Sequence, residues 1–99
     1  MANPRVEVDK ELEPLVAEFL ERRRQDMPLL KAALAKGDFE TLRTKGHQVK
    51  GAGGGYGFDH LSQIGRAIEE AAKVKNGPAI QTQLDDMESY LAGVEVIYQ

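Results

Sequence analysis

One of the two histidines, His47, stands among residues that could support phosphoryl chemistry. Imidazole is the side chain best suited to act as a nucleophile or proton carrier near neutral pH. If the stretch is helical, Lys50 shares a face with His47, and its ammonium can neutralise a phosphoryl group on the ring. Arg43, four residues before His47, adds positive charge one turn back. These residue types at this spacing predict a histidine that accepts a phosphoryl group from another macromolecule.

The run GAGGGYG at 51–57 follows His47 and contains half of the ten glycines of the chain. A Walker-type phosphate loop is disfavoured, because the lysine precedes the glycines, no Ser or Thr follows in place, and no strand is predicted before them. A flexible linker remains an alternative for a glycine-rich segment. The helical period nevertheless continues through Val49, Gly53 and Tyr56. We therefore expect Gly51 and Gly53 in the last helical turns, with the helix end among residues 54–57.

Glycine inside a helix costs about 1 kcal/mol relative to alanine, so something should offset it. Gly51 lies four residues after His47 and leaves the space beside the imidazole uncovered. We expect Gly46, Gly51 and Gly54 to give a docking partner access to the histidine. An exposed apolar rim, including Val49 or Tyr56, would then help the partner to dock.

Four amphipathic segments surround this stretch, at about 9–36, 39 to 54–57, 60–72 and 78–94. Asp9 or Pro14 is the predicted start of the first helix, which Pro28 should kink or divide. Gly37 should end that helix, and aspartates at 38 and 59 should cap the next two. Residues 1 to about 8 are expected to form an extended arm, and no strand is predicted.

The short connections between these segments predict an all-α fold, an antiparallel up-down four-helix bundle with a short N-terminal arm. Ninety-nine residues are enough for one domain, taken as 1–99 with a core of about 12–95. The predicted helical stripes include Val16, Leu42, Ile64 and Leu84 as core residues.

The composition narrows the functional classes. The net charge of −3 disfavours nucleic acid as the main partner, since phosphate backbones select basic surfaces. The chain has no cysteine, no signal-peptide pattern and no apolar run of membrane-spanning length. We expect a cytoplasmic protein that does not insert into membranes. No metal site and no cofactor of its own are expected, since the histidines and carboxylates lack a metal-binding spacing such as HExxH.

The segment GHQVKGAGGGYGFDHLSQIGRAIEEAA resembles the histidine-containing phosphotransfer (HPt) domains of bacterial phosphorelays. The matching features are His-x-x-Lys-Gly, a small-residue stretch, and a leucine-led helix that ends in an acidic residue. The preceding ALAKGDFETLRTKGH also resembles the family, in which a Gly-Asp turn leads into the histidine helix. The resemblance covers about residues 12–95. The triple glycine at 53–55 departs from the alanine or serine of many relatives, which leaves the length of the helix past His47 open.

The resemblance implies that His47 exchanges a phosphoryl group with an aspartate of a receiver domain. It implies that Lys50 stabilises this group, that Gly51 lets the receiver approach, and that Glu69, or its neighbour Glu70, hydrogen-bonds the other ring nitrogen. Mg²⁺ would be held by the partner receiver domain. The expected partners are response-regulator receiver domains or hybrid histidine kinases, and the chain itself is expected to be a monomeric phosphocarrier without kinase activity.

Two other readings stay open. The chain could be a helical docking module that keeps the fold without the transfer chemistry. It could also be the phosphoacceptor piece of a larger chemotaxis-type kinase, although the Met start and short arm favour an independent protein. His60 is expected to be an ordinary surface residue. The arginines at 22–24 are expected to form a solvated helix face paired with Glu18 and Glu21.

Overall fold

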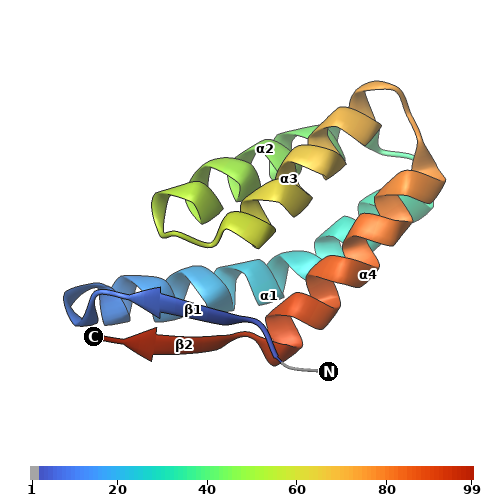
Figure 1. Cartoon of the computed structure of the whole chain (residues 1–99). Coiled ribbons are helices and arrows are strands. Elements are labelled where there is room, and N and C mark those ends of the chain that lie inside the picture. The colour runs from blue at the N-terminus through green and yellow to red at the C-terminus, as the bar shows by residue number, and fades with distance from the viewer. Residues whose placement is uncertain (1–2) are drawn as a thin grey trace.

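The computed structural model describes residues 3–99, which form a four-helix bundle with a two-stranded ribbon (Figure 1). In chain order the elements are β1 (Arg5–Val8), a 3-10 turn (Lys10–Leu12), α1 (Glu13–Lys36), α2 (Phe39–Gly55), α3 (Asp59–Lys73), α4 (Gly77–Gly93) and β2 (Glu95–Tyr98). The mostly helical class predicted from the sequence is confirmed. None of the described helices is both long and apolar enough to cross a bilayer.

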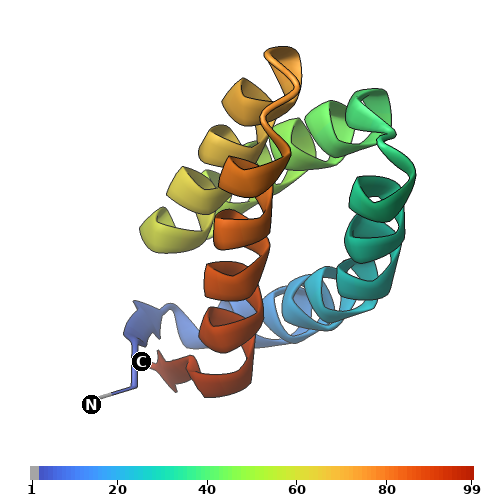
Figure 2. The same ribbon diagram turned by 90° about the vertical axis from the view of Figure 1, so that its right-hand side faces the viewer.

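Helices α2 and α3 form the tightest pair of the bundle, and α4 packs against both α3 and α1. Figure 2 shows α2 and α3 together in the upper part of the molecule, with the ribbon below them beside the end of α4. Two to three residues join consecutive helices, so each helix starts close to where the previous one ends. This arrangement presents the outer face of α2, which contains His47, to solvent.

The helix ends follow the chemistry of their capping residues. Gly37 takes a left-handed conformation with φ of 69° and ends α1, and the Asp38 carboxylate then accepts the Thr41 backbone N–H to cap α2. Both predictions are confirmed, as is the end of α2 within residues 54–57. The predicted cap at Asp59 is wrong by one position: Phe58 is the N-cap of α3, and its buried ring packs 5.4 Å from that of Phe19.

Helix α1 confirms the second of the two predicted starts, Pro14, and is not divided at Pro28. Asp9 caps only the 3-10 turn, and α1 itself begins at Glu13 with Pro14 in its first turn. Pro28 lies inside α1 without dividing it, so the helix continues from Glu13 to Lys36. Figure 2 shows that α1 bends along its length, as expected for a helix with an internal proline, which removes one helical hydrogen bond and clashes with the carbonyl four residues back.

The ribbon of β1 and β2 was not predicted. The two strands run parallel, with Arg5 opposite Glu95 and Val8 opposite Tyr98. The expected extended arm is therefore extended over its described part but is docked, and Val8 is buried against the core. Residues 1 and 2, also assigned to the arm, lie outside the described residues. The ribbon also ends the last helix: α4 stops at Gly93, and Val94 turns into an extended conformation.

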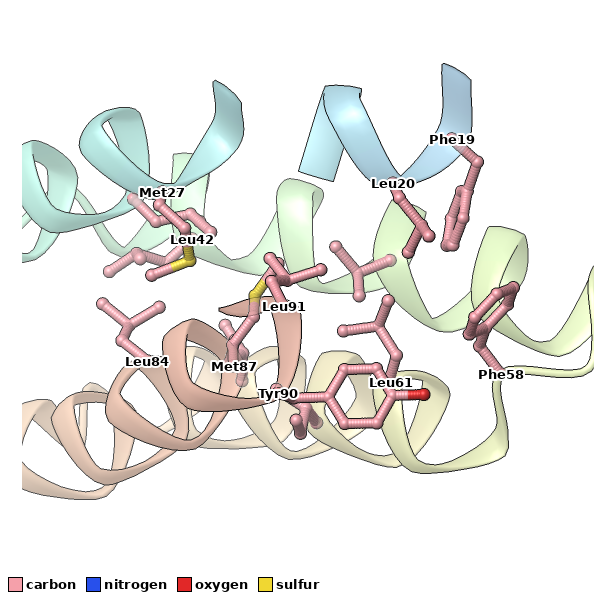
Figure 3. Close-up of a cluster of buried hydrophobic side chains, with 14 of the residues drawn as sticks. Phe19, Leu20, Met27, Leu42, Phe58, Leu61, Leu84, Met87, Tyr90 and Leu91 are labelled. Atoms are coloured by element: carbon pink, nitrogen blue, oxygen red, sulfur yellow. The ribbon is translucent and has the colours of Figure 1, made fainter. Parts of the chain in front are cut away.

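Side chains from all four helices meet in one core (Figure 3). The predicted stripes supply most of it. The fully buried large side chains are Val16, Leu30, Leu42, Val49, Phe58, Leu61, Ile64, Ile68, Ile80, Leu84 and Met87. Burying each such side chain contributes about 1.5–3 kcal/mol, so the bundle is stabilised mainly by these stripes.

A buried ionic cluster links α1 to α2 at Asp26. The Asp26 carboxylate lies 3.2 Å from Arg23 Nε and 3.3 Å from Lys45 Nζ, and the Arg23 guanidinium lies over the Phe19 ring. The predicted solvated face at residues 22–24 is thus wrong for Arg23, whose side chain is only 11% exposed. Arg22 does pair with Glu18, whereas Arg24 donates to the Leu91 carbonyl, one of the last carbonyls of α4.

Two glycines allow the backbones of α2 and α3 to touch. A Cβ on Gly65 would lie 2.5 Å from the Lys50 backbone nitrogen, and one on Gly46 would lie 2.8 Å from the Glu69 backbone nitrogen. These neighbours are backbone atoms, which cannot move without separating the helices. Gly46 and Gly65 therefore set the distance between the helix that bears His47 and the helix that bears Glu69.

Replacing Gly65 with alanine is expected to lower the free energy of unfolding by about 2–3 kcal/mol, because the added methyl group overpacks the interface. Gly51→Ala is the matched control, since a Cβ there meets no described atom within 4 Å outside its own stretch of helix. That change should raise the free energy of unfolding by about 0.5–1 kcal/mol through helix propensity. Urea unfolding of both variants checks this pair, and equal effects would contradict the close contact.

Candidate functional site

His47 lies on the outer face of α2 with its side chain 67% exposed. Its Nδ1 lies 3.0 Å from Glu69 Oε2, across the interface with α3. No other described residue bonds to the ring. The imidazole is therefore anchored through one nitrogen, and the other nitrogen, Nε2, is free to meet a partner from solvent.

Glu69 is one of two buried carboxylates of the described chain, with its side chain 8% exposed. Its two oxygens bind two different groups of α2: Oε2 contacts His47 Nδ1, and Oε1 accepts from Lys50 Nζ at 2.9 Å. A buried carboxylate needs such partners, because an unpaired charge away from water is strongly destabilising. Glu69 thus fixes the imidazole and the ammonium in one arrangement.

The same contacts keep Glu69 ionised. The hydrogen bond from Lys50 is the main cause that lowers the pKa of Glu69, and the bond from His47 adds to it, while burial opposes both. An ionised Glu69 can only accept hydrogen bonds, so Nδ1 must carry the proton that it shares with the carboxylate. Neutral imidazole in this tautomer has its lone pair on Nε2, the exposed nitrogen.

Glu69 should make the stability of the protein depend on acid pH. Because its folded-state pKa is lowered, its contribution is fully present above the unfolded value of about 4.3 and is lost as the pH falls through the folded value. Urea unfolding from pH 7 to pH 3 should therefore show a steeper loss in the wild type than in Glu69→Gln.

The wild type and this variant share another acid-sensitive carboxylate, which caps the start of α2 nine residues before His47. Bonds from the Thr41 hydroxyl and backbone N–H lower the pKa of the N-cap Asp38, and this effect cancels between the two proteins. Parallel acid profiles would mean that Glu69 is not held ionised by α2.

The two predicted basic residues differ in their surroundings. Lys50 is one turn from His47, but in this structure its ammonium is held by Glu69 rather than left free. Its side chain is 37% exposed, so it can reach solvent on the side of the imidazole. Arg43 is exposed and makes no ion pair within residues 3–99. The structure brings His47, Lys50 and Glu69 together and leaves Arg43 one turn away.

The predicted access glycines occupy different faces of α2. Gly51 and Gly54 are exposed, and among residues 3–99 no atom of another element lies within 4 Å of a Cβ on Gly51. Gly46 is buried against α3, so its predicted docking role is wrong: it cannot touch a partner that approaches His47. The prediction of an exposed apolar rim is also wrong for Val49, which is fully buried. Tyr56 is partly exposed, and its ring packs on that of Phe19 with centroids 5.3 Å apart.

Two residues that support the site were missed in the sequence. Gly65 is described above, and Ser62 donates from its hydroxyl to the Lys50 carbonyl at 2.7 Å. This bond joins α3 to the backbone of the lysine that faces Glu69. A glycine inside the apolar stripe of Leu61, Ile64 and Ile68 was the available signal for close packing, whereas nothing in the sequence marks Ser62.

His60 lies away from His47, at the start of α3. Its Nε2 is 3.3 Å from the Asp86 carboxylate, and its ring packs 5.2 Å from that of Tyr90. It is half exposed, as expected for a surface residue, but it is paired. Within residues 3–99, no three histidine or carboxylate side chains gather closely enough to hold a metal ion.

Comparison with known proteins places the chain in a family. The chain matches no curated protein and no solved structure. A family model, that of the Hpt domain, matches residues 14–96, which cover all four helices except the first residue of α1 and include His47, Lys50 and Glu69. Hpt domains are phosphocarriers of phosphorelays, which agrees with an exposed, anchored histidine. This chain belongs to the Hpt domain family.

Proposed function

We propose that this protein carries a phosphoryl group on His47, accepting it from and passing it to receiver-domain aspartates. The observation that supports this most is the bridging carboxylate of Glu69, which binds His47 Nδ1 and Lys50 Nζ together. A surface histidine without a role has no need of a buried, ionised partner. Here that partner selects the tautomer with a nucleophilic nitrogen facing solvent.

The transfer step follows from this geometry. The Nε2 lone pair attacks phosphorus of the receiver's aspartyl phosphate, the N–P bond forms, and the P–O bond breaks with its electron pair leaving on the aspartate. The ring keeps its proton on Nδ1 and becomes positively charged. The Glu69 carboxylate stabilises that charge at 3.0 Å, and the reverse transfer uses the same contacts.

Lys50 supplies positive charge for the phosphoryl group, whereas Glu69 supplies negative charge for the ring. Its ammonium binds the same carboxylate as the His47 ring, and the side chain can turn from Glu69 toward the oxygens of a phosphoryl group on Nε2. Arg43 adds weaker positive potential from one turn back. Gly51 leaves open the surface that the receiver must cover.

The remaining parts of the proposal concern the whole protein. Its partners are receiver domains of response regulators or hybrid kinases in a bacterial, cytoplasmic pathway, and the receiver holds the Mg²⁺. The chain acts as a monomer and has no kinase activity of its own. The helices form an up-down antiparallel bundle, which is supported by connections too short to cross the molecule.

The test uses a panel of receiver domains labelled with radioactive phosphate on their aspartates, each mixed with the purified chain. An acid-labile, base-stable label on the chain is expected with at least one donor, with phosphorus on Nε2 by NMR. Tight receiver binding without any label would instead identify a docking module. A label located on a residue other than His47 would contradict the proposed carrier.

A further inference from the structure

The outer edge of β1 has unpaired backbone groups within the described chain. The sheet contains only β1 and β2, so each strand has one partner and one free edge. The carbonyls of Pro4 and Val8 accept from β2 and its flanking residue, which shows that the even-numbered residues face β2. Because successive residues of a strand alternate in direction, Arg5 and Glu7 turn their N–H and C=O groups away from β2.

That free edge borders an open cleft of about 600 Å³. Arg5 and Glu7 lie on one wall, and Gly57, Asp59, His60 and Tyr90 lie on the other. Figure 2 shows the ribbon below the start of α3, which forms this second wall. The volume lies within the range of about 300–1,000 Å³ that is usual for ligand pockets.

The cleft is acidic. Arg5 is engaged by Glu95, and His60 by Asp86. Glu7 and Asp59 have no ion-pair partner within residues 3–99, so two negative charges face the cleft. Burial is the main cause that raises the pKa of Tyr90, and the negative charge of Asp59 adds to it. A cation in the cleft would meet both unpaired carboxylates and the Tyr90 phenol.

We propose that this cleft binds an extended, basic segment of a partner protein, which adds to β1 as a third strand. The backbone of the segment pairs with the N–H and C=O groups of Arg5 and Glu7. A lysine or arginine of the segment lies between Glu7 and Asp59. The four residues of β1 match a segment of about 13 Å. This surface is separate from His47, so binding here would tether the carrier without covering its histidine.

The probe is a capped peptide of about eight residues that alternates threonine and valine, with one central lysine. Titration into the ¹⁵N-labelled chain should shift the amide signals of β1 and of the start of α3. The same peptide with glutamate in place of lysine should bind more weakly. No shift with the lysine peptide at about 1 mM, or equal binding of both peptides, would overturn the proposal.

A single proline substitution tests the backbone pairing between β1 and the peptide. Arg5→Pro removes one edge N–H but none of the bonds to β2, and proline is tolerated at such an edge position. Arg5→Ala is the matched control, since both variants lose the ion pair with Glu95. The proline variant should bind the lysine peptide about three- to tenfold more weakly than the alanine variant. Equal affinities would overturn the proposal.

Two further measurements separate a loss of peptide binding from a loss of stability and from self-association of the chain. If Arg5→Pro lowers the unfolding midpoint below that of Arg5→Ala, peptides N-methylated on alternate amides replace it, and one of the two methylation patterns should abolish binding. Binding unaffected by either pattern would overturn the proposal. Sedimentation of the free chain should show a monomer. A dimer that Arg5→Pro dissociates would assign the edge to a second copy and overturn it too.

Discussion

Replacing His47 with glutamine is expected to abolish phosphoryl acceptance, with a rate reduced on the order of 10³-fold or more. Glutamine has no nucleophilic ring nitrogen, yet its amide can still donate to the Glu69 carboxylate. The side chain is mostly exposed, so the free energy of unfolding should change by about 0.5 kcal/mol or less. Transfer of labelled phosphate from a receiver domain measures the effect.

His60→Gln is the matched control for that experiment. It removes the other histidine of the chain, which is paired with Asp86 at the far end of α3 from Glu69. This variant should accept phosphate at the wild-type rate. Labelling that persists in His47→Gln and disappears in His60→Gln would move the carrier to the start of α3.

Glu69→Gln is expected to slow phosphoryl acceptance by about 10–100-fold, the usual cost of losing the group that orients a functional histidine. The glutamine can still accept a hydrogen bond from Nδ1, so the change removes mainly the negative charge. Without that charge the positive ring formed by transfer is less stable. ¹⁵N shifts of the imidazole should also show a smaller fraction of the tautomer with the proton on Nδ1.

Glu70→Gln provides the matched change of charge one residue along. Glu70 is exposed, and its one ion pair within the described part of the chain is with Lys73, at 3.7 Å. The Glu70→Gln variant should have the wild-type rate of phosphoryl acceptance and the wild-type tautomer of His47. This pair of variants also decides the register that the sequence left open between the two glutamates. A slow Glu70 variant beside a normal Glu69 variant would contradict the bridging role.

The sequence was sufficient to predict the four helices and the helix face that His47 shares with Lys50. The spacing of Leu61, Ile64 and Ile68 predicts a helix with one buried side, and the structure buries those residues. His47 and Lys50 share a helix face because three residues make nearly one turn, a relation that needs no tertiary information. Their contact with α3 is different, since it depends on how two helices are rotated against each other.

The contact of His47 with Glu69 was therefore expected only from the family resemblance. The glycines show the same limit. Gly46 and Gly51 look alike in the sequence, but one faces α3 and the other faces solvent. A glycine in a sequence does not show which neighbouring element, if any, leaves no room for a side chain at that position.

The ribbon could not be predicted for a reason of length. RVEV and EVIY each alternate or cluster apolar residues over only four positions, too short for a period of two to stand out. Each segment is identified as a strand only by its pairing with the other, and about 90 residues of sequence separate the paired positions. The helix ends, by contrast, depend on residues next to them, and Gly37 and Asp38 were read correctly.

The pairing of Arg5 with Glu95 also bears on the order in which the chain folds. The two residues are 90 positions apart, so the ribbon closes a loop that contains nearly the whole chain. Bringing such distant segments together costs more chain entropy than forming a hairpin such as α2 and α3, whose connection is three residues long. We therefore expect α2 and α3, which contain His47 and Glu69, to assemble early from local contacts, and the ribbon to close late and open early. The phosphoryl site can persist while the two ends of the chain separate.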